Sequence, residues 1–212
     1  MRIIPNGIFL PCQMSGAMSK AEQTRAFIIE KTAPIFNSKG YAGTSLNDIT
    51  AATGLTKGSI YGNFANKDEV ALAVFDYNLQ RVEVLIRSEM SKCFSAAEKL
   101  MVYVKVYGNS ARYPFLDNGC PIQNTAIEAD DTHPRLRQKV SEALTGWKKS
   151  IVKLIRLGVE EGDFKPLDNA EQVALTIMAL IEGSIMIGKA TGKSSYRKAI
   201  MQTLEQTIKN LE

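Results

Sequence analysis

The sequence predicts an all-α protein with about nine helices, and three observations support that prediction. Apolar residues recur every three or four positions through most of the chain, which is the spacing of a buried helix face. The alternation of apolar and polar residues that is typical of strands is scarce. Glycine and proline residues fall at intervals that fit helix lengths. The 212 residues, 45% of them hydrophobic, contain no repeat and have the composition of an ordinary folded protein.

The first helix is expected over residues 20–38. Gly40 follows it and can adopt the left-handed conformation that commonly ends a helix. Pro34 lies inside the segment, removes one backbone donor and is expected to bend the helix locally. The inward face repeats at helical spacing and consists of Ile28, Thr32, Ile35 and Phe36.

Two short helices around a tight turn are expected next. Ser45 begins the second helix, and Asp48 comes three residues later, which is the spacing of a capping box. Gly54 ends this helix, Thr56 caps the third, and the third continues to about Asn63. This layout is a helix-turn-helix, in which the later helix can enter the major groove of DNA.

The fourth helix begins after Asn66, which caps it, and carries Glu69 at its third position. It is long, and its apolar stripe consists of Val70, Val74, Tyr77, Val82, Leu85 and Ile86. Five further helices are expected over residues 96–107, 121–129 and 134–161, from a cap at Asp168 to about residue 190, and from Ser194 or Ser195 onward.

The net charge and the cysteine content limit which binding partners and which cellular compartment are expected. A net charge of +4 is compatible with DNA binding, although only clustered charge would establish it. The three cysteines, Cys12, Cys93 and Cys120, form no Cys-x-x-Cys pair, which argues against a disulfide scaffold or a zinc site and fits a reducing cytoplasm. No apolar run approaches the roughly 20 residues that span a bilayer. We therefore predict a cytoplasmic protein with no membrane, metal or cofactor requirement.

A dense group of residues between Ala26 and Phe75 follows a recognisable pattern of order and spacing. The residues of this pattern are Phe36, Gly40, Tyr41, Thr44, Ser45, Asp48, Ile49, Gly54, Tyr61, Phe64 and Lys67. The segment resembles the DNA-binding domain of the TetR family of bacterial transcriptional regulators. Thr50 and Thr53 stand where the family pattern often has alanine, and Asn63 stands where it often has histidine.

The second half of the chain carries a weaker resemblance. The segment NGCPIQNTAIEADDTHPRLRQKV, the helix with Trp147, and Ile181-Glu182-Gly183 look like a subgroup of TetR-type effector domains. Pro5, Gly7 and Pro11 interrupt the opening residues, so residues 1–19 are expected to form a flexible arm. The resemblance implies a DNA-binding domain over 20–65 and an effector-binding and dimerisation domain over 66–212. An upstream start codon, with Met14 or Met18 as the working start, is the alternative interpretation of the arm.

The implied function is sequence-specific transcriptional regulation, most often repression that a small molecule relieves. The short third helix presents free backbone N–H groups to phosphates, and Lys57 and Ser59 are placed to contact base edges. Gly58 and Gly62 each cost about 1 kcal/mol relative to alanine in a helix, which close backbone approach to DNA would offset. The predicted DNA contacts are Thr44, Ser45, Thr56, Lys57, Gly58, Ser59, Tyr61, Asn63 and Lys67.

Each predicted DNA contact has an alternative structural explanation. Thr44, Ser45 and Thr56 are good helix caps whatever they touch. Tyr61 can pack with the core, and isolated surface lysines are usually only solvated. Their joint placement along one face favours the functional interpretation.

One helix-turn-helix reads few bases, so a homodimer on a palindromic duplex DNA operator is expected. The resemblance implies that the last two helices form the interface, whereas the alternative is that their apolar stripes close the core of the protomer. The predicted interface residues are Ile177, Leu180, Ile181, Gly183, Ser184, Ile185, Gly188, Ile200, Leu204 and Ile208.

A small-molecule site is expected between the DNA-binding domain and that interface, with switching transmitted through the fourth helix. Aromatic walls with few polar groups are typical of such sites, although each residue alone is more often core. Cys120 is either a sensor of oxidants or electrophiles or an inert buried thiol. The predicted ligand contacts are Tyr103, Tyr107, Tyr113, Phe115, Cys120, Gln123, Asn124 and Trp147.

The sequence offers little support for two other classes of function, an enzyme and an architectural DNA binder. An enzyme would need a catalytic motif, and none of His-Glu-x-x-His, a phosphate loop or Gly-x-Ser-x-Gly is present. His133 with Asp130 and Asp131 could coordinate a metal, yet their place before Pro134 fits a helix start. A nonspecific architectural DNA binder would need a broader basic surface than +4 provides.

Overall fold

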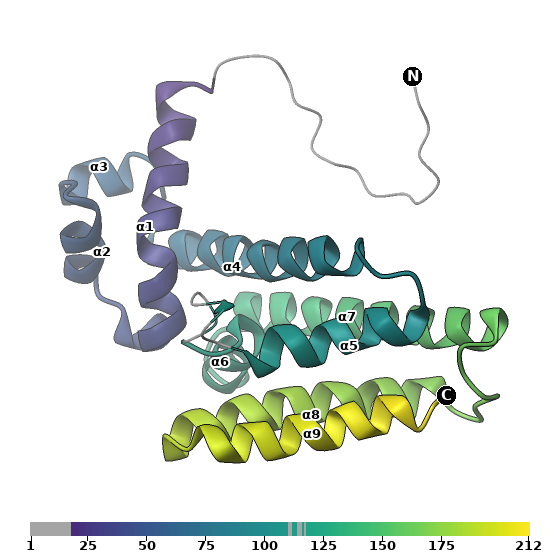
Figure 1. The fold of residues 1–212 in the computed structure, drawn as a ribbon. Coiled ribbons are helices and arrows are strands. Elements are labelled where there is room, and N and C mark those ends of the chain that lie inside the picture. The colour runs from purple at the N-terminus through teal and green to yellow at the C-terminus, as the bar shows by residue number, and fades with distance from the viewer. Residues whose placement is uncertain (1–17, 110–111, 114–115, 117) are drawn as a thin grey trace, which may run out of the picture.

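The computed structural model describes residues 18–109, 112–113, 116 and 118–212, and these residues form an all-α fold, as predicted (Figure 1). Most of the expected arm, residues 1–17, and the predicted ligand contact Phe115 lie outside the described residues. The helices of the described part are α1 Lys20–Gly43, α2 Leu46–Thr53, α3 Lys57–Tyr61, α4 Lys67–Met90, α5 Ala96–Gly108, α6 Pro121–Ala129, α7 Pro134–Glu161, α8 Ala170–Thr191 and α9 Ser194–Lys209.

The helices form two parts, which we call the head (α1–α3) and the bundle (α5–α9). In the head, α2 and α3 lie beside α1 at one end of the molecule (Figure 1). Helix α4 packs on α1 and also contacts α5, α6 and α7, so it joins the two parts. Helices α8 and α9 pack on each other along the edge of the bundle that is farthest from α3 (Figure 1).

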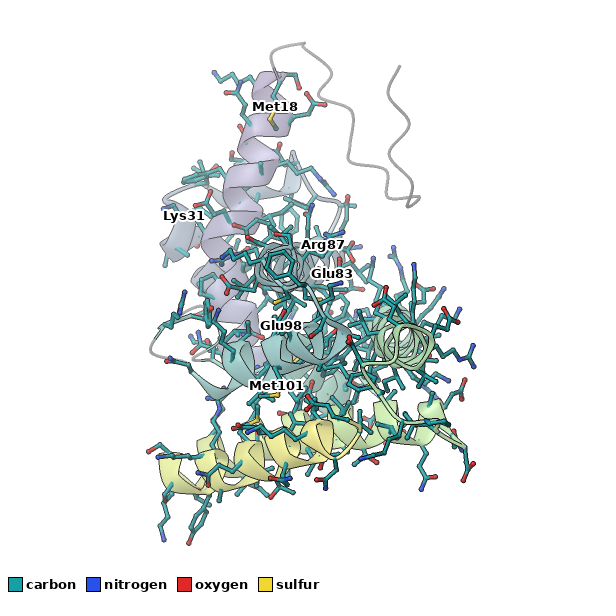
Figure 2. The ribbon with its side chains drawn as sticks, turned by 45° about the vertical axis from the view of Figure 1, so that its right-hand side comes forward. Met18, Lys31, Glu83, Arg87, Glu98 and Met101 are labelled. Carbon is teal, nitrogen blue, oxygen red and sulfur yellow. The ribbon has the colours of Figure 1, made fainter. Side chains whose placement is uncertain are left out.

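The helices have outer faces with charged side chains and inner faces that pack on other helices. Figure 2 shows Lys31 on the outer side of α1, and Glu83 and Arg87 as a neighbouring pair on the outer side of α4, where their charged groups are 3.8 Å apart. Met101 of α5 lies on the side that faces α8 and α9 in the same view. The bundle core therefore lies between α4 and α5 on one side and α8 and α9 on the other.

A small apolar core sets the orientation of the two short head helices. Ile28 of α1, Ile49 of α2 and Ile60 of α3 are each at most 1% exposed. Phe64, also 1% exposed, fills the space between the end of α3 and the start of α4. Because these side chains come from every helix of the head, α3 cannot rotate without opening the core.

The predicted helix caps of the head are confirmed. Ser45, Thr56 and Asn66 each accept a hydrogen bond from the backbone N–H three residues later, at 3.1, 3.1 and 2.9 Å. Gly54 has a φ of 68°, which is the left-handed conformation that ends α2 and starts the turn. Local hydrogen bonding therefore sets where each of these helices begins.

Helix α1 is longer than predicted, since it continues to Gly43 instead of stopping before Gly40. Gly40 nevertheless has the expected left-handed conformation, with a φ of 74°, and interrupts the regular helix. A Cβ at this position would overlap the Glu128 carboxylate of α6. Both the conformation and the close approach of α6 therefore require glycine here.

Two other predicted boundaries are wrong by one or two residues. Asn169, not Asp168, caps α8, because its side chain accepts a hydrogen bond from the Gln172 N–H at 3.0 Å. Helix α3 ends at Tyr61 instead of Asn63. Differences of this size are common because helix ends fray.

Most of the predicted dimer stripe lies in the core of the protomer instead. These side chains are at most 3% exposed because α8 and α9 pack on each other and on α5 and α7: Ile177, Ile181, Ser184, Ile185, Leu204 and Ile208. Gly188 faces α9, where an added Cβ would lie 3.0 Å from the Arg197 Cβ. Leu180, Gly183 and Ile200 are only partly buried and stay candidates for an interface.

Helix α8 is long and apolar enough to cross a membrane by length and composition alone, contrary to the expectation that no segment approaches this limit. A core helix has the same properties, and α8 packs against α9, α7 and α5. Its inward residues Ala174, Ile177 and Ile181 are fully buried there.

Candidate nucleic-acid interface and effector site

Helix α3 presents a small exposed face on a rigid support. Its five residues are anchored from below by Ile60, while Lys57 and Gly58 are exposed and Tyr61 is 48% exposed. Thr56 caps the helix through the Ser59 N–H. The first turn therefore points backbone N–H groups and one lysine outward, which suits phosphate and base contacts.

Gly58 has no packing reason to be glycine within the protomer. A Cβ added there would approach only the Thr56 Oγ1 atom, at an ordinary 3.9 Å, and the residue is helical. Alanine would therefore fit and would favour the helix. The absence of a side chain is explained if another molecule comes close to the backbone at this point.

Ser45 stays a predicted DNA contact, although its cap role already uses the hydroxyl. Its Oγ donates to Asp48 Oδ2 at 2.6 Å, and Asp48 also forms an ion pair with Lys39 at 2.6 Å. The hydrogen bond from Lys39, together with those from Ser45, lowers the pKa of Asp48 well below its usual range. The start of α2 is therefore a fixed, exposed helix end.

Three predicted phosphate contacts have internal partners instead. Thr44 is fully buried, and its hydroxyl donates to the Gly40 carbonyl at 2.6 Å. The Lys67 ammonium donates to the Tyr41 and Thr44 carbonyls at 2.9 and 3.1 Å, so it closes the end of α1. The Asn63 amide donates to the Ser59 carbonyl at 2.9 Å and ends α3. These internal hydrogen bonds form because unpaired carbonyls at helix ends attract the nearest donors. Contacts of these three residues with DNA stay a prediction.

Arg25 was missed from the sequence and holds the head together. Its guanidinium lies 4.0 Å from the centre of the Phe64 ring and donates to the Asn63 carbonyl at 2.5 Å. It also pairs with Glu69 at 2.7 Å. The Ala65 N–H and the Arg25 guanidinium lower the pKa of Glu69. Arg25 thus ties α1 to α3 and α4, and no local pattern marks a contact across about forty residues.

In the bundle, the structure brings several predicted ligand residues together. The Trp147 ring lies 6.2 Å from the Tyr103 ring and 6.0 Å from the Tyr107 ring, measured between centroids. Tyr103 and Tyr107 are buried, as are Tyr113 and Cys120. Burial raises the pKa of Tyr103 to about 12, so its hydroxyl is neutral. The three aromatic rings form one side of a buried cluster.

Asn124 does not belong to this cluster. Its amide donates to the Asn37 carbonyl at 2.8 Å and to the Asn118 carbonyl at 2.7 Å, so it braces α6 against α1. Gln123, one residue earlier, instead donates to the Glu182 carbonyl of α8 at 2.9 Å. Adjacent positions on α6 therefore contact the head and the bundle core.

Cys120 has the properties of a buried structural thiol. It is 1% exposed, and burial raises its pKa well above the ordinary value. A reactive cysteine needs an accessible thiolate, which these conditions disfavour. The structure therefore favours the inert interpretation over redox or electrophile sensing.

Glu182 was missed as a site residue. Both of its carboxylate oxygens are inaccessible to solvent and accept no hydrogen bond of good geometry from a described residue. Burial raises the pKa of Glu182 to about 7, while a weak interaction with the Cys120 thiol partly offsets the rise. A glutamate in the middle of an apolar helix was the available signal, since burying a carboxylate is costly.

A polar junction connects α6 and α7 to the end of α1. The Glu128 carboxylate accepts hydrogen bonds from the Tyr41 and Ala42 N–H groups at 2.5 and 2.6 Å. The His133 ring packs edge-on against Tyr41 with centroids 4.8 Å apart, and its Nδ1 atom caps α7. Tyr41 also donates to Asp68, which raises the pKa of the tyrosine to about 12. His133 therefore serves the helix start and the junction.

Comparison with known proteins agrees with this architecture. A family model described as bacterial regulatory proteins of the tetR family matches residues 28–74, and one described as a tetracyclin repressor-like C-terminal domain matches residues 96–204. A TetR-family regulator from Cytophaga hutchinsonii has a solved structure that is 46% identical, covers 93% of this chain and 98% of its own, and gives a TM-score of 0.89.

Two further relatives extend the comparison. A TetR regulator from Chloroflexus aurantiacus J-10-FL is 35% identical, with a TM-score of 0.85 over 91% of this chain and 97% of its own. The uncharacterized HTH-type transcriptional regulator YxaF of Bacillus subtilis (strain 168) is 27% identical over 172 residues, which are 80% of this chain and 87% of that protein.

The fold and the head define a helix-turn-helix regulator with a separate helical domain. The chain belongs to the TetR family of bacterial transcriptional regulators. Members of this family act as dimers on operator DNA, typically repress, and respond to ligands; the family consists of regulators, not enzymes.

Proposed function

We propose that this protein is a homodimeric cytoplasmic repressor that binds a palindromic DNA operator and leaves it when a small molecule enters the bundle. The observation that carries this proposal is the exposed, side-chain-free surface at Gly58 on a helix that the head core holds rigid. Such a surface suits close backbone approach to a duplex. The proposed DNA contacts are Ser45, Thr56, Lys57, Gly58, Ser59 and Tyr61.

The proposed dimer surface is the outer face of α8 and α9. Leu175, Met186 and Tyr196 are large apolar residues that are 52%, 49% and 44% exposed there. Leu175, Gly183 and Met186 lie on one helical stripe, and a Cβ at Gly183 would meet nothing within 4 Å. An apolar stripe with a small residue at its centre suits close packing of a second copy.

Helix α6 is proposed to transmit the ligand signal together with α4. One end of α6 contacts the buried cluster through Gln123, and the other holds α1 through Glu128. A shift of α6 on ligand binding would therefore pull on the last turn of α1. The ligand can shift this equilibrium only as far as it binds the two states with different affinity.

Footprinting on the DNA upstream of its own coding sequence tests the proposal. A dimer on a palindrome protects two half-sites about 10 base pairs apart, centre to centre. Excess random DNA should leave a regulator bound but should displace an architectural binder.

Two substitutions sharpen this experiment. Tyr61→Ala is expected to weaken binding to all sequences about equally, whereas Lys57→Ala is expected to change the preferred sequence as well. Lys149→Ala, an exposed lysine on α7, is the charge-matched control and should bind like the wild type. Wild-type affinity in both head variants at physiological salt would refute the proposed docking of α3.

A further inference from the structure

The carboxylate of Glu182 lies inside the bundle without a counter-charge. None of the ion pairs among the described residues includes it, and both oxygens are inaccessible to solvent. Among the described residues, the Cys120 thiol interacts with this carboxylate as a donor, and a thiol is a weak donor. An unpaired carboxylate in such a place costs several kcal/mol, so the fold tolerates it at the expense of stability.

Aromatic rings lie beside this carboxylate. The Cys120 thiol interacts with the carboxylate directly. Burial raises the pKa of the Tyr107 hydroxyl, and the charges of Cys120 and Glu182 raise it further. Tyr107 and Tyr103 in turn flank the Trp147 ring at 6.0 and 6.2 Å. Helices α5, α7 and α8 therefore contribute the carboxylate and the three rings of one cluster, and Cys120 adds its thiol from the start of α6.

A structural role does not account for this arrangement. Gln123 ties α6 to α8 through the backbone carbonyl of residue 182, which any side chain at that position would allow. A protonated carboxyl would donate a hydrogen bond, yet neither oxygen has an acceptor of good geometry among the described residues. The Arg197 guanidinium donates to the Tyr107 backbone carbonyl. Among the described residues, no cation forms an ion pair with the Glu182 carboxylate.

We propose that this cluster is the effector site and that its ligand is an organic cation, a quaternary ammonium, a phosphonium or a protonated amine, carried on an apolar body. The positive centre would sit between the Glu182 carboxylate and the faces of Tyr103, Tyr107 and Trp147, which attract cations through their ring quadrupoles. This inference deepens the proposed function and relies on it only for the consequence at the operator.

The charge of the ligand follows from what the cluster offers. An anion would be repelled by the carboxylate, and a neutral ligand would leave it unpaired in a still drier site. A cation supplies the missing counter-charge. Its apolar body would separate the packed rings and replace the contacts between them with contacts to the ligand. The rings pack on one another in this structure, so binding would spread α5, α6 and α7 around the ligand.

Trp147 provides the test, because it is the single tryptophan of the chain. Its fluorescence is titrated with tetraphenylphosphonium and, in parallel, with the neutral triphenylphosphine oxide. The purified full-length protein should show saturable quenching by the cation and at least roughly tenfold weaker binding of the neutral compound, as expected for one charge-assisted contact.

Substitutions at Glu182 locate the effect. Glu182→Gln keeps the size and removes the charge, so it should lose the preference for the cation. Glu182→Asp keeps the charge and should retain part of that preference. Glu142→Gln, an exposed glutamate on α7 that contacts Gln138, is the control and should behave like the wild type.

Several results would overturn the inference. Equal quenching of the wild type by the cation and the neutral compound would do so, even if the Gln variant fails to fold. So would a Gln variant that keeps the cation preference, or no response of the wild type to either tetraphenylphosphonium or benzyltrimethylammonium. These titrations need no DNA, so loss of cation binding with an intact operator footprint removes only this inference, whereas cation binding without a footprint removes the proposed function.

Discussion

The head and the bundle of this protein treat their polar groups in opposite ways. In the head and at the start of α4, the side chains of Arg25, Asn63 and Lys67 each donate a hydrogen bond to a backbone carbonyl. Buried apolar side chains fill the space between the three head helices. In the bundle, Glu182 and Tyr113 have buried polar atoms without hydrogen-bond partners among the described residues. The comparison indicates that the head is built to hold one shape, while the bundle core keeps unsatisfied groups that a ligand can complete.

Breaking the anchor of the head should produce the largest effect. Phe64→Ala removes a ring that is 1% exposed and also removes the surface on which Arg25 rests. A loss of about 3–5 kcal/mol in unfolding free energy is expected, as for other buried rings. Denaturant titration measures it. Phe94→Ala is the matched control, because Phe94 is 93% exposed and its loss should cost little; equal effects at the two positions would contradict the rigid head.

Removing the buried charge of Glu182 from the bundle should raise the free energy of unfolding instead of lowering it. The pKa of Glu182 is raised by burial from 4.5 to about 7, so the folded state binds the proton more tightly than the unfolded state. Stability from this group is complete below about pH 4.5 and is lost as the pH rises to about 7. The acting neighbours are the Cys120 thiol and the Tyr107 hydroxyl, both neutral in this range.

Glu182→Gln should therefore stabilise the ligand-free protein at pH 8 by roughly 2–3 kcal/mol and leave it nearly unchanged at pH 4.5. Denaturant titrations at the two pH values measure the difference, with Glu142→Gln as the exposed control. Destabilisation by Glu182→Gln at pH 8 would mean that the carboxylate has a favourable partner in the free protein.

The junction between the two parts should respond to a smaller change. Glu128→Gln removes the negative charge of the carboxylate that accepts hydrogen bonds from the Tyr41 and Ala42 N–H groups. The glutamine side chain has one carbonyl oxygen, which cannot accept both hydrogen bonds equally well. A loss of about 1–2 kcal/mol is expected from two weakened charge-assisted hydrogen bonds. Operator binding should persist while release by an effector becomes weaker, as measured by gel shift with increasing effector. Unchanged release would argue that α4 transmits the signal without α6.

The smallest effect on stability is expected for Gly58→Ala, a substitution that distinguishes a role in DNA binding from a role in folding. Gly58→Ala should stabilise the free protein by up to about 1 kcal/mol, because the space around an added Cβ is open and alanine favours a helix. It should nevertheless weaken operator binding in a gel shift. Gly146→Ala on α7, where a Cβ also meets nothing within 4 Å, should give a similar gain in stability and leave DNA binding intact. Parallel behaviour of the two variants would exclude a close approach at Gly58.

Predictions from the sequence succeeded where the interaction is local. Ser45, Thr56 and Asn66 each find their partner three residues away, so a pattern of residue types is sufficient to locate the helix starts. The hydrogen bonds of Lys67 and Asn63 to backbone carbonyls were not predicted, because these partners depend on which helix ends come near the two side chains. Glu182 was missed because the spacing of apolar residues says that α8 is buried but not what surrounds a charge on it.

The apolar stripes of the last two helices show the same limit. Their period placed Ile177, Ile181 and Leu204 on apolar stripes that were predicted to form a dimer interface. The pattern is identical whether a stripe packs in the protomer or on a second copy. Only the packing of α8 against α9, α7 and α5 distinguished the two, and it left Leu175, Met186 and Tyr196 on the outside.

The amino-acid sequence by itself determined the helical fold, the ends of most helices and the exposed turn that presents α3, because hydrogen bonds within a few residues set them. The tertiary structure decided which polar groups find partners: those of the head meet carbonyls and charges from neighbouring helices, whereas the carboxylate of Glu182 meets aromatic rings. That difference depends on the distances between side chains far apart in the chain, which only the packing of the helices defines.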